Sequence, residues 1–203
     1  MLVFWQQRLV FLATPKTGST AIEAALESLA SVSVQRPPEL KHTNAQRYQR
    51  FLAPYLERAS GHTFEVVALM REPLDWLGSW YRFRQRDDVM DSRKSTRNMD
   101  FSGFVEAYLQ AERPPFADVG SQARFLTKQG DLAVDRLFRY EDIADFVVFL
   151  EDRLECEVIL PRVNVSPDAD VTLDPQLEAR LRQDCAEDFA LYDSIPRYSE
   201  AAL

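Results

Sequence analysis

The chain has 203 residues and a mass of 23.4 kDa, with 46% hydrophobic and 28% charged residues, a composition typical of a folded globular domain. The formal net charge of −8 argues against a nucleic-acid partner, because proteins that bind nucleic acids usually carry a basic excess. No apolar run approaches the roughly 20 residues that a membrane-spanning helix needs. We therefore expect a single domain over residues 1–203, without a transmembrane segment.

The cellular compartment is predicted from the start of the chain and from its cysteines. The first residues, MLVFWQQRLVFLATP, lack the basic start and the clean apolar centre of a secretory signal. Cys156 and Cys185 have neither the spacing of a metal site nor that of a redox pair, so reduced thiols are expected rather than a disulfide. These features predict a cytoplasmic protein.

Short β-rich runs alternate with helical patterns along the chain, which is typical of an α/β fold with a largely parallel sheet. Strands are predicted at 8–13, 31–35, 64–70 and 134–140. Helices are predicted to begin near Ser19, Asn44, Pro73 and Phe101, and to cover 121–128, 141–154 and 174–193. Residues 84–100 are charge-rich without an apolar period, which predicts a long surface loop or lid.

The first predicted strand runs directly into TPKTGST at 14–20, which places a lysine, a glycine and hydroxyl residues at the start of a helix. A helix start offers free N–H groups and the positive end of the helix dipole, and small residues let an anion approach the backbone. We therefore expect this loop to bind a phosphate group. An ordinary helix start, with Ser19 or Thr17 as N-cap, would explain the hydroxyls but not the lysine and the glycine.

A loop that binds a nucleoside triphosphate has the pattern GxxxxGK[ST], with the lysine directly after the second glycine. Here Lys16 precedes Gly18, and no upstream glycine has the required spacing. Such an enzyme also needs a carboxylate at the end of a second strand to hold Mg²⁺. The strand at 64–70 is followed by Arg71 and only then by Glu72. An ATP-dependent kinase is therefore the weaker alternative.

Two motifs together resemble those of the PAPS-dependent sulfotransferases, where PAPS is 3′-phosphoadenosine-5′-phosphosulfate. PKTGST at 15–20 is similar to the loop that binds the 5′-phosphosulfate, and MREPLDWLGSWYRFR at 70–84 is similar to the 3′-phosphate motif. In that motif an arginine at a strand end precedes a serine on the next helix by eight residues. Arg71 and Ser79 have this spacing, and Pro73 suits a first helical turn.

Weaker similarity extends to VDRLFRYEDI, LPRVNVSP and EDFALYDSI, so the resemblance covers most of the chain. One departure is Trp76, three positions after Pro73, where the family often has a basic residue. The tryptophan instead packs on the core or near the adenine in this interpretation. The resemblance also suggests that Asn164 and Ser166 reach the nucleotide from the C-terminal side.

The resemblance implies a three-layer α/β sandwich, with a central, mainly parallel sheet flanked by helices as in P-loop NTPases. It implies transfer of a sulfuryl group from PAPS to a hydroxyl of a small molecule or a glycan, with PAP as product and no requirement for a metal. Lys16 would stabilise the leaving group. The residues implied in binding PAPS are Lys16, Thr17, Gly18, Ser19 and Thr20 at the 5′ side, and Arg71 and Ser79 at the 3′-phosphate.

An acceptor hydroxyl needs a general base, and His42 in ELKHTNAQRY is the candidate. Some glycan sulfotransferases resemble this arrangement, with a histidine in a KH segment as the base. An imidazole with a pKa near 6.5 can accept a proton at cellular pH. Glu39 is the alternative base, Lys41 either assists or is solvated, and a solvated loop histidine is the alternative for His42.

Two further alternatives stay open at this point. A catalytically inert nucleotide- or glycan-binding module of the same fold would bind PAP without transferring a group to any acceptor. The basic residues after the second motif either line an entrance for an anionic acceptor or belong to a solvated loop, and the interleaved aspartates favour the solvated loop. These residues are Arg82, Arg84, Arg86, Arg93, Lys94 and Arg97.

Overall fold

The computed structural model describes residues 1–89, 91–163 and 167–197. Its main sheet has five strands in the order β3-β1-β2-β4-β7. The pairs β2–β4 and β4–β7 are parallel, whereas β1 is antiparallel to both of its neighbours, so four strands share one direction. The α/β class with a mostly parallel central sheet is therefore confirmed. The strands are β1 (Leu2–Phe4), β2 (Leu9–Leu12), β3 (Val32–Ser33), β4 (Glu65–Met70) and β7 (Arg136–Arg139).

Helices follow the strands and cover both faces of the sheet. A separate two-stranded ribbon, β5 (Thr127–Lys128) and β6 (Asp131–Leu132), lies beside α7. The helices are α1 (Ser19–Leu26), α2 (Pro38–Lys41), α3 (Ala45–Arg47), α4 (Ala53–Ser60), α5 (Pro73–Phe83), α6 (Phe101–Tyr108), α7 (Gln122–Leu126), α8 (Ile143–Leu154), α9 (Pro175–Asp184) and α10 (Ala186–Asp193).

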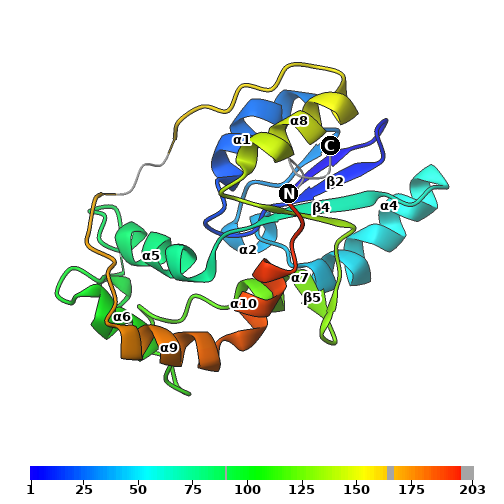
Figure 1. Cartoon of the computed structure of the whole chain (residues 1–203). Helices are drawn as coiled ribbons and strands as arrows, with labels where there is room; N and C mark the ends of the chain where they lie inside the picture. The colour runs from blue at the N-terminus through cyan, green and yellow to red at the C-terminus, as the bar shows by residue number, and fades with distance from the viewer. Residues whose placement is uncertain (90, 164–166, 198–203) are drawn as a thin grey trace.

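The alternation of side chains along β2 divides the core into two layers. Leu9 and Phe11 face α1 and α8, while Val10 and Leu12 face the layer that contains α3, α4 and α7, and all four are fully buried. Figure 1 shows α1 and α8 side by side on one face of the sheet, with α7 and α10 on the other. A central strand of this kind must be apolar throughout.

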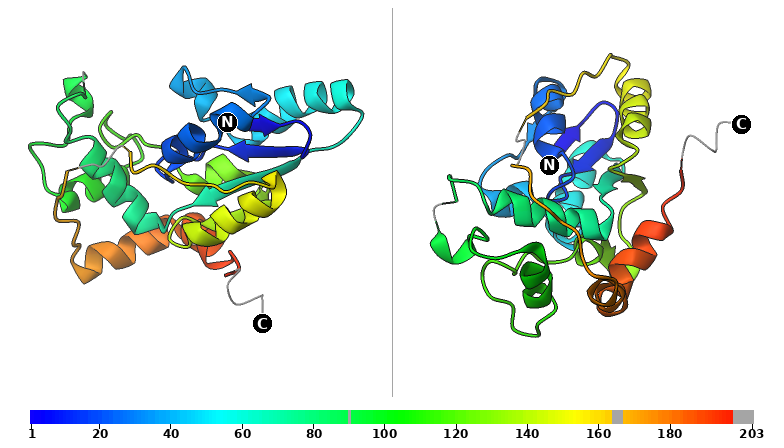
Figure 2. Two further views of the ribbon diagram at one scale, coloured as in Figure 1. Left: turned by 90° about the horizontal axis from the view of Figure 1, so that it is seen from above. Right: turned by 60° about the vertical axis from the view of Figure 1, so that its left-hand side comes forward.

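A third apolar cluster lies beyond the carboxyl ends of the strands, where α5, α6 and α9 pack together. Figure 2 shows these helices grouped at one end of the sheet, with α4 at the opposite end. The aromatic rings of α5 and α6 join them, since Tyr81 contacts both Phe101 and Phe104. The helix α5 therefore packs beside the carboxyl ends of β2 and β4, where Trp76 contacts the loop that follows β2.

Several predicted elements differ from the observed ones. The strand β1 was not predicted, because three apolar residues show no alternation and the turn at 5–8 contains no glycine, proline, asparagine or aspartate. The strand predicted at 31–35 is reduced to two exposed edge residues. The helix predicted from Asn44 contains a π-helical turn at Tyr48–Leu52, and the one predicted over 174–193 divides at Cys185.

The predicted surface loop at 84–100 contains only one short 3₁₀ turn, Ser92–Lys94, among its described residues. Ion pairs of neighbouring charges cover its outer side, as expected for a solvated segment, with Arg86 paired to Asp88 as one example. Arg84 is the exception. Its buried guanidinium donates to the backbone oxygens of Pro115 and Asp118, so this arginine holds the loop to the molecule.

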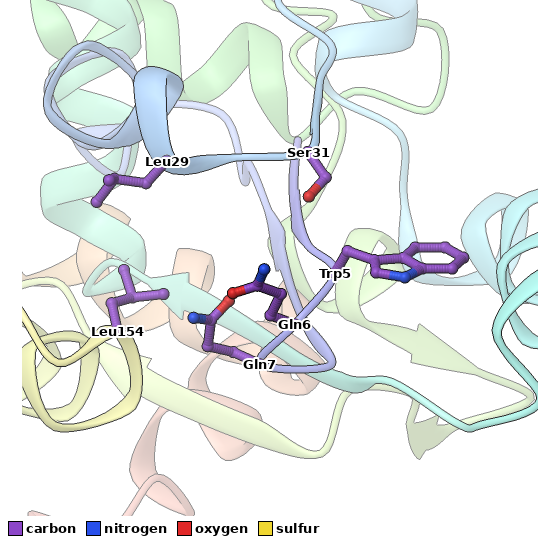
Figure 3. Close-up of a pocket in the computed structure, with 6 residues that line it drawn as sticks. All are labelled: Trp5, Gln6, Gln7, Leu29, Ser31 and Leu154. Carbon is purple, nitrogen blue, oxygen red and sulfur yellow. The ribbon is translucent and has the colours of Figure 1, made fainter.

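Within the described ranges, no helix is both long and apolar enough to cross a membrane. A cavity of about 310 Å³ lies near the β1–β2 turn, at the edge of the sheet where β2 begins. Figure 3 shows Gln6 and Gln7 side by side in it, with Leu29 and Leu154 to one side and Trp5 to the other. Residues of the two motifs do not line this cavity, since they follow the opposite ends of the strands.

Replacing Phe146 with alanine tests the layer between the sheet and α8. Its ring is fully buried and lies 5.6 Å from the ring centroid of Phe11 and 5.1 Å from that of Phe138. Because the cavity would be enclosed by these rings, we expect the free energy of unfolding in urea to fall by about 3–5 kcal/mol. Phe51→Ala is the matched control, since that ring is 62% exposed. Equal losses in the two variants would contradict the described core.

Candidate functional site

The loop between β2 and α1 begins its helix without a side-chain cap. Gly18 is the N-cap residue, and the hydroxyl of Thr17 donates to the backbone oxygen of Thr14 at 2.9 Å. Neither Ser19 nor Thr17 therefore caps the helix, and the ordinary-cap interpretation of these hydroxyls is wrong. The first helical hydrogen bonds are donated by Ala21 and Ile22, so the N–H groups before them have the free position typical of a helix start.

Two residues in the left-handed region shape this loop. Gly18 has φ 71°, and a methyl group on it would lie 3.0 Å from the ring of Tyr140, so the position needs glycine for both conformation and space. Lys16 has φ 65°, a conformation that costs a residue other than glycine roughly 1–2 kcal/mol. The surrounding structure therefore holds Lys16 in an unfavourable backbone conformation, as is frequent at functional sites.

The ammonium group of Lys16 is packed against aromatic rings of α5. Its Nζ lies 3.8 Å from the centroid of Phe83 and 5.2 Å from that of Trp80. No carboxylate pairs with it in the part of the chain that the structure describes. Burial and, to a smaller extent, repulsion from nearby arginines together lower its pKa to about 7. These arginines are Arg71, Arg86, Arg84 and Arg82.

Arg71, at the end of β4, is held by a buried glutamine. The amide of Gln122 accepts from the backbone N–H of Arg71 at 2.9 Å and donates to its backbone oxygen at 2.8 Å. The guanidinium lies over the ring of Tyr140, donates to the backbone oxygen of Lys16 at 3.3 Å, and pairs with Asp75 at 2.6 Å. The backbone and the side chain of this arginine are both fixed.

The two motifs are thus in direct contact, although 55 residues separate Lys16 from Arg71. A second contact comes from Trp76, which is buried on α5 and donates from its indole N–H to the backbone oxygen of Pro15 at 2.9 Å. This tryptophan therefore joins α5 to the loop.

Ser79 lies on the same face of α5 as Asp75 and Arg82, at helical spacings of four and three residues. Asp75 pairs with Arg82 at 3.4 Å as well as with Arg71, so its carboxylate bridges two guanidinium groups. Ser79 itself is 9% exposed. This face therefore carries one arginine, one hydroxyl and one carboxylate, and Arg71 lies beside it through its pair with Asp75.

His42 lies next to the start of the loop. Its Nδ1 is 2.6 Å from the backbone oxygen of Ala13, and because a carbonyl oxygen only accepts, Nδ1 carries the proton. The neutral ring then has its lone pair on Nε2. Burial lowers the pKa of His42, and this lowering favours the neutral form at neutral pH. The histidine is not a solvated loop residue.

The other two candidates of this segment are placed differently. Lys41 pairs with buried Glu23 at 2.7 Å and donates to the hydroxyl of Thr20 at 3.1 Å, so it is neither solvated nor free. Lys41 therefore connects α2 to Thr20 at the end of the loop. Glu39 is exposed on α2. Asn164 and Ser166, suggested for the nucleotide, lie outside the described residues.

Three residues of the site were missed from the sequence or given another role. Gln122 lies far along the chain in a helix of five residues, and no motif marks it. Tyr140 supplies the ring over which Arg71 lies, and Trp76 supplies the hydrogen bond to Pro15. In the described ranges, no three histidine, cysteine, aspartate or glutamate side chains gather as a metal site. Comparisons with protein-family models, curated proteins and solved structures found no match.

Replacing Lys16 with methionine tests the burial of its ammonium. Between pH 7 and the ordinary lysine pKa of about 10.4, the unfolded chain binds a proton that the folded chain has lost. The contribution of Lys16 to the free energy of unfolding therefore increases with pH, by at most about 1.4 kcal/mol per pH unit. We expect Lys16→Met to be more stable than the native chain at pH 7. We also expect the variant to lack the increase in the free energy of unfolding that the native chain shows between pH 7 and 9.5.

The measurement is urea unfolding at four pH values in this range, with Lys128→Met as the matched control because Lys128 is exposed. The control should keep the native pH dependence. If Lys16→Met keeps it as well, the ammonium is not buried as described.

Proposed function

We propose that this protein is a PAPS-dependent sulfotransferase, which transfers a sulfuryl group to a hydroxyl of a small molecule or a glycan and releases PAP. The observation that carries the proposal is Lys16 at a helix start: its ammonium has no carboxylate partner among the described residues, and its backbone oxygen accepts from Arg71. Such an excess of positive charge suits an anion with two separate charged groups. A P-loop-like arrangement of strand, loop and helix is part of the same proposal.

The residues present fit a ligand with phosphate groups at both ends. Lys16 and the N–H groups of residues 17–20 would hold the 5′ side, since the uncapped helix start offers donors there. Arg71 and Ser79 would hold the 3′-phosphate. The carboxylate of Asp75 now bridges Arg71 and Arg82, so a 3′-phosphate would take over part of its ion pairing with these two guanidinium groups.

PAPS, when bound, supplies a sulfuryl group already activated by its phosphate leaving group. The chain must then remove a proton and balance charge. His42 would take the proton of the acceptor hydroxyl on Nε2, as Nδ1 keeps its own proton on the oxygen of Ala13. The new bond joins the acceptor oxygen to sulfur, and the bond from sulfur to the phosphate oxygen breaks. Lys16 would neutralise the charge that develops on that oxygen.

Ligand-dependent melting tests the nucleotide site. At about a hundred times its Kd, a ligand stabilises by roughly 2.7 kcal/mol, which is a rise of about 5–10 °C for a chain of this size. We expect PAP to give this rise, and adenosine 5′-monophosphate and ATP with Mg²⁺ to give much less. Arg71→Ala should remove most of the response to PAP, whereas Arg180→Ala, on an exposed helix face, should not. If ATP with Mg²⁺ raises the melting temperature and PAP does not, an ATP-dependent kinase becomes the better proposal.

Replacement of His42 tests the general base. We expect His42→Ala to bind PAP like the native chain but to transfer the sulfuryl group from labelled PAPS about 10²–10⁴-fold more slowly, across a panel of hydroxyl acceptors. His62→Ala is the matched control, because that histidine is exposed and outside the site. Binding of PAP without transfer by the native chain to any acceptor would favour the inert module. Undiminished transfer by His42→Ala would remove the histidine from the mechanism.

A further inference from the structure

A cavity of about 300 Å³ opens beside the loop. It borders Pro15, two residues after the backbone oxygen that His42 contacts, and Asn44, two residues after His42 itself. The size falls in the range of small-molecule sites. The remaining lining residues come from α5, from α7 and from the segment that precedes α7: Trp76, Val119, Gly120, Ser121, Gln122, Arg124 and Phe125.

Several polar groups around this cavity are already engaged. The hydroxyl of Ser121 donates to Asp188 and accepts from the backbone N–H of Arg124, and both amide atoms of Gln122 bond the backbone of Arg71. Asp188 lies behind Ser121, where its second oxygen accepts from the N–H of Ala123. No acidic residue is among the described residues that line the cavity.

The side-chain groups that remain available are donors. The Oδ1 of Asn44 accepts from the N–H of Arg47, which leaves its Nδ2 hydrogens for a ligand. Arg124 is exposed, and its guanidinium makes no hydrogen bond or ion pair within the described ranges. A wall with free donors and no carboxylate suits a ligand with acceptor oxygens. In a chain with a net charge of −8, such a local positive site is selective for an anion.

The rest of the lining is apolar. Pro15, Val119 and the rings of Trp76 and Phe125 form most of it. These surfaces suit a flat or ring-shaped body, and the planar fork of a guanidinium suits a carboxylate. One ligand can satisfy both features if a carboxylate and a hydroxyl are attached to the same ring system.

We propose that this cavity is the acceptor site, and that it takes a ring-shaped hydroxyl compound with a carboxylate, held by Arg124. This inference rests on the proposed function, because it assigns the hydroxyl to the proton acceptor His42. Arg124 is then a specificity residue that selects charged acceptors over neutral ones, rather than a catalytic residue. Phe125 contributes to the binding of both kinds of acceptor.

The test compares two probes of nearly equal size, p-nitrophenyl β-D-glucuronide and p-nitrophenyl β-D-glucoside, by titration calorimetry. The protein is saturated with PAP, so that the anionic probe cannot occupy the loop at Lys16. We expect the glucuronide to bind at least tenfold more tightly than the glucoside. Arg124→Gln should abolish this preference, whereas Arg180→Gln, another exposed arginine, should retain it. Phe125→Ala should weaken the binding of both probes, while the ratio of their affinities stays at the native value.

Equal affinities for the two probes, or a preference that survives in Arg124→Gln, would overturn the assignment. The melting response to PAP separates this outcome from failure of the proposed function. A normal response to PAP in Arg124→Gln, with the preference lost, supports the acceptor site. If PAP gives no response in the native chain while the Arg124-dependent preference persists, the sulfotransferase proposal fails, and so does the role of the cavity as its acceptor site.

Discussion

Positive charge gathered at the carboxyl ends of β2 and β4, only part of it balanced by Asp75, is the constraint on which the site depends. The ammonium of Lys16 packs against aromatic rings without a carboxylate partner in the part of the chain that the structure describes, and Arg71 donates to the backbone oxygen of Lys16. A buried, unpaired ammonium destabilises the folded chain, and its lowered pKa expresses that cost. Beside the ion pair of Arg71 with Asp75, neutral and firmly packed contacts hold the two motifs together.

These neutral contacts come from residues outside both motifs. Gln122 holds the backbone of Arg71 from α7, and Tyr140 supplies a ring from the end of β7. The ring of Tyr140 also excludes any side chain at position 18, so one residue sets the conformation of the loop and the place of the guanidinium. The site is therefore built where three parallel strands end, as is common in α/β folds. Its geometry depends on the whole sheet.

Lys41 and His42 contact the two ends of the loop at 14–20. Lys41 reaches Thr20 and Glu23 on α1, and His42 reaches Ala13 before the loop. This arrangement orients the imidazole through its Nδ1 and leaves Nε2 as the basic atom. A cavity with free donors adjoins the loop. Under the proposed function, donor and acceptor sites would meet at this loop.

The sequence by itself determined the α/β class, the approximate position of most helices, and the two strand-to-helix junctions that carry Lys16 and Arg71. These features are local, because side-chain periodicity and turn chemistry are set within a few residues. Only the tertiary structure decided that Gly18 rather than a hydroxyl residue caps α1, that Lys41 is paired, and that Gln122 holds Arg71. The last of these contacts joins residues 51 apart, and it depends on strand order, which local patterns do not encode.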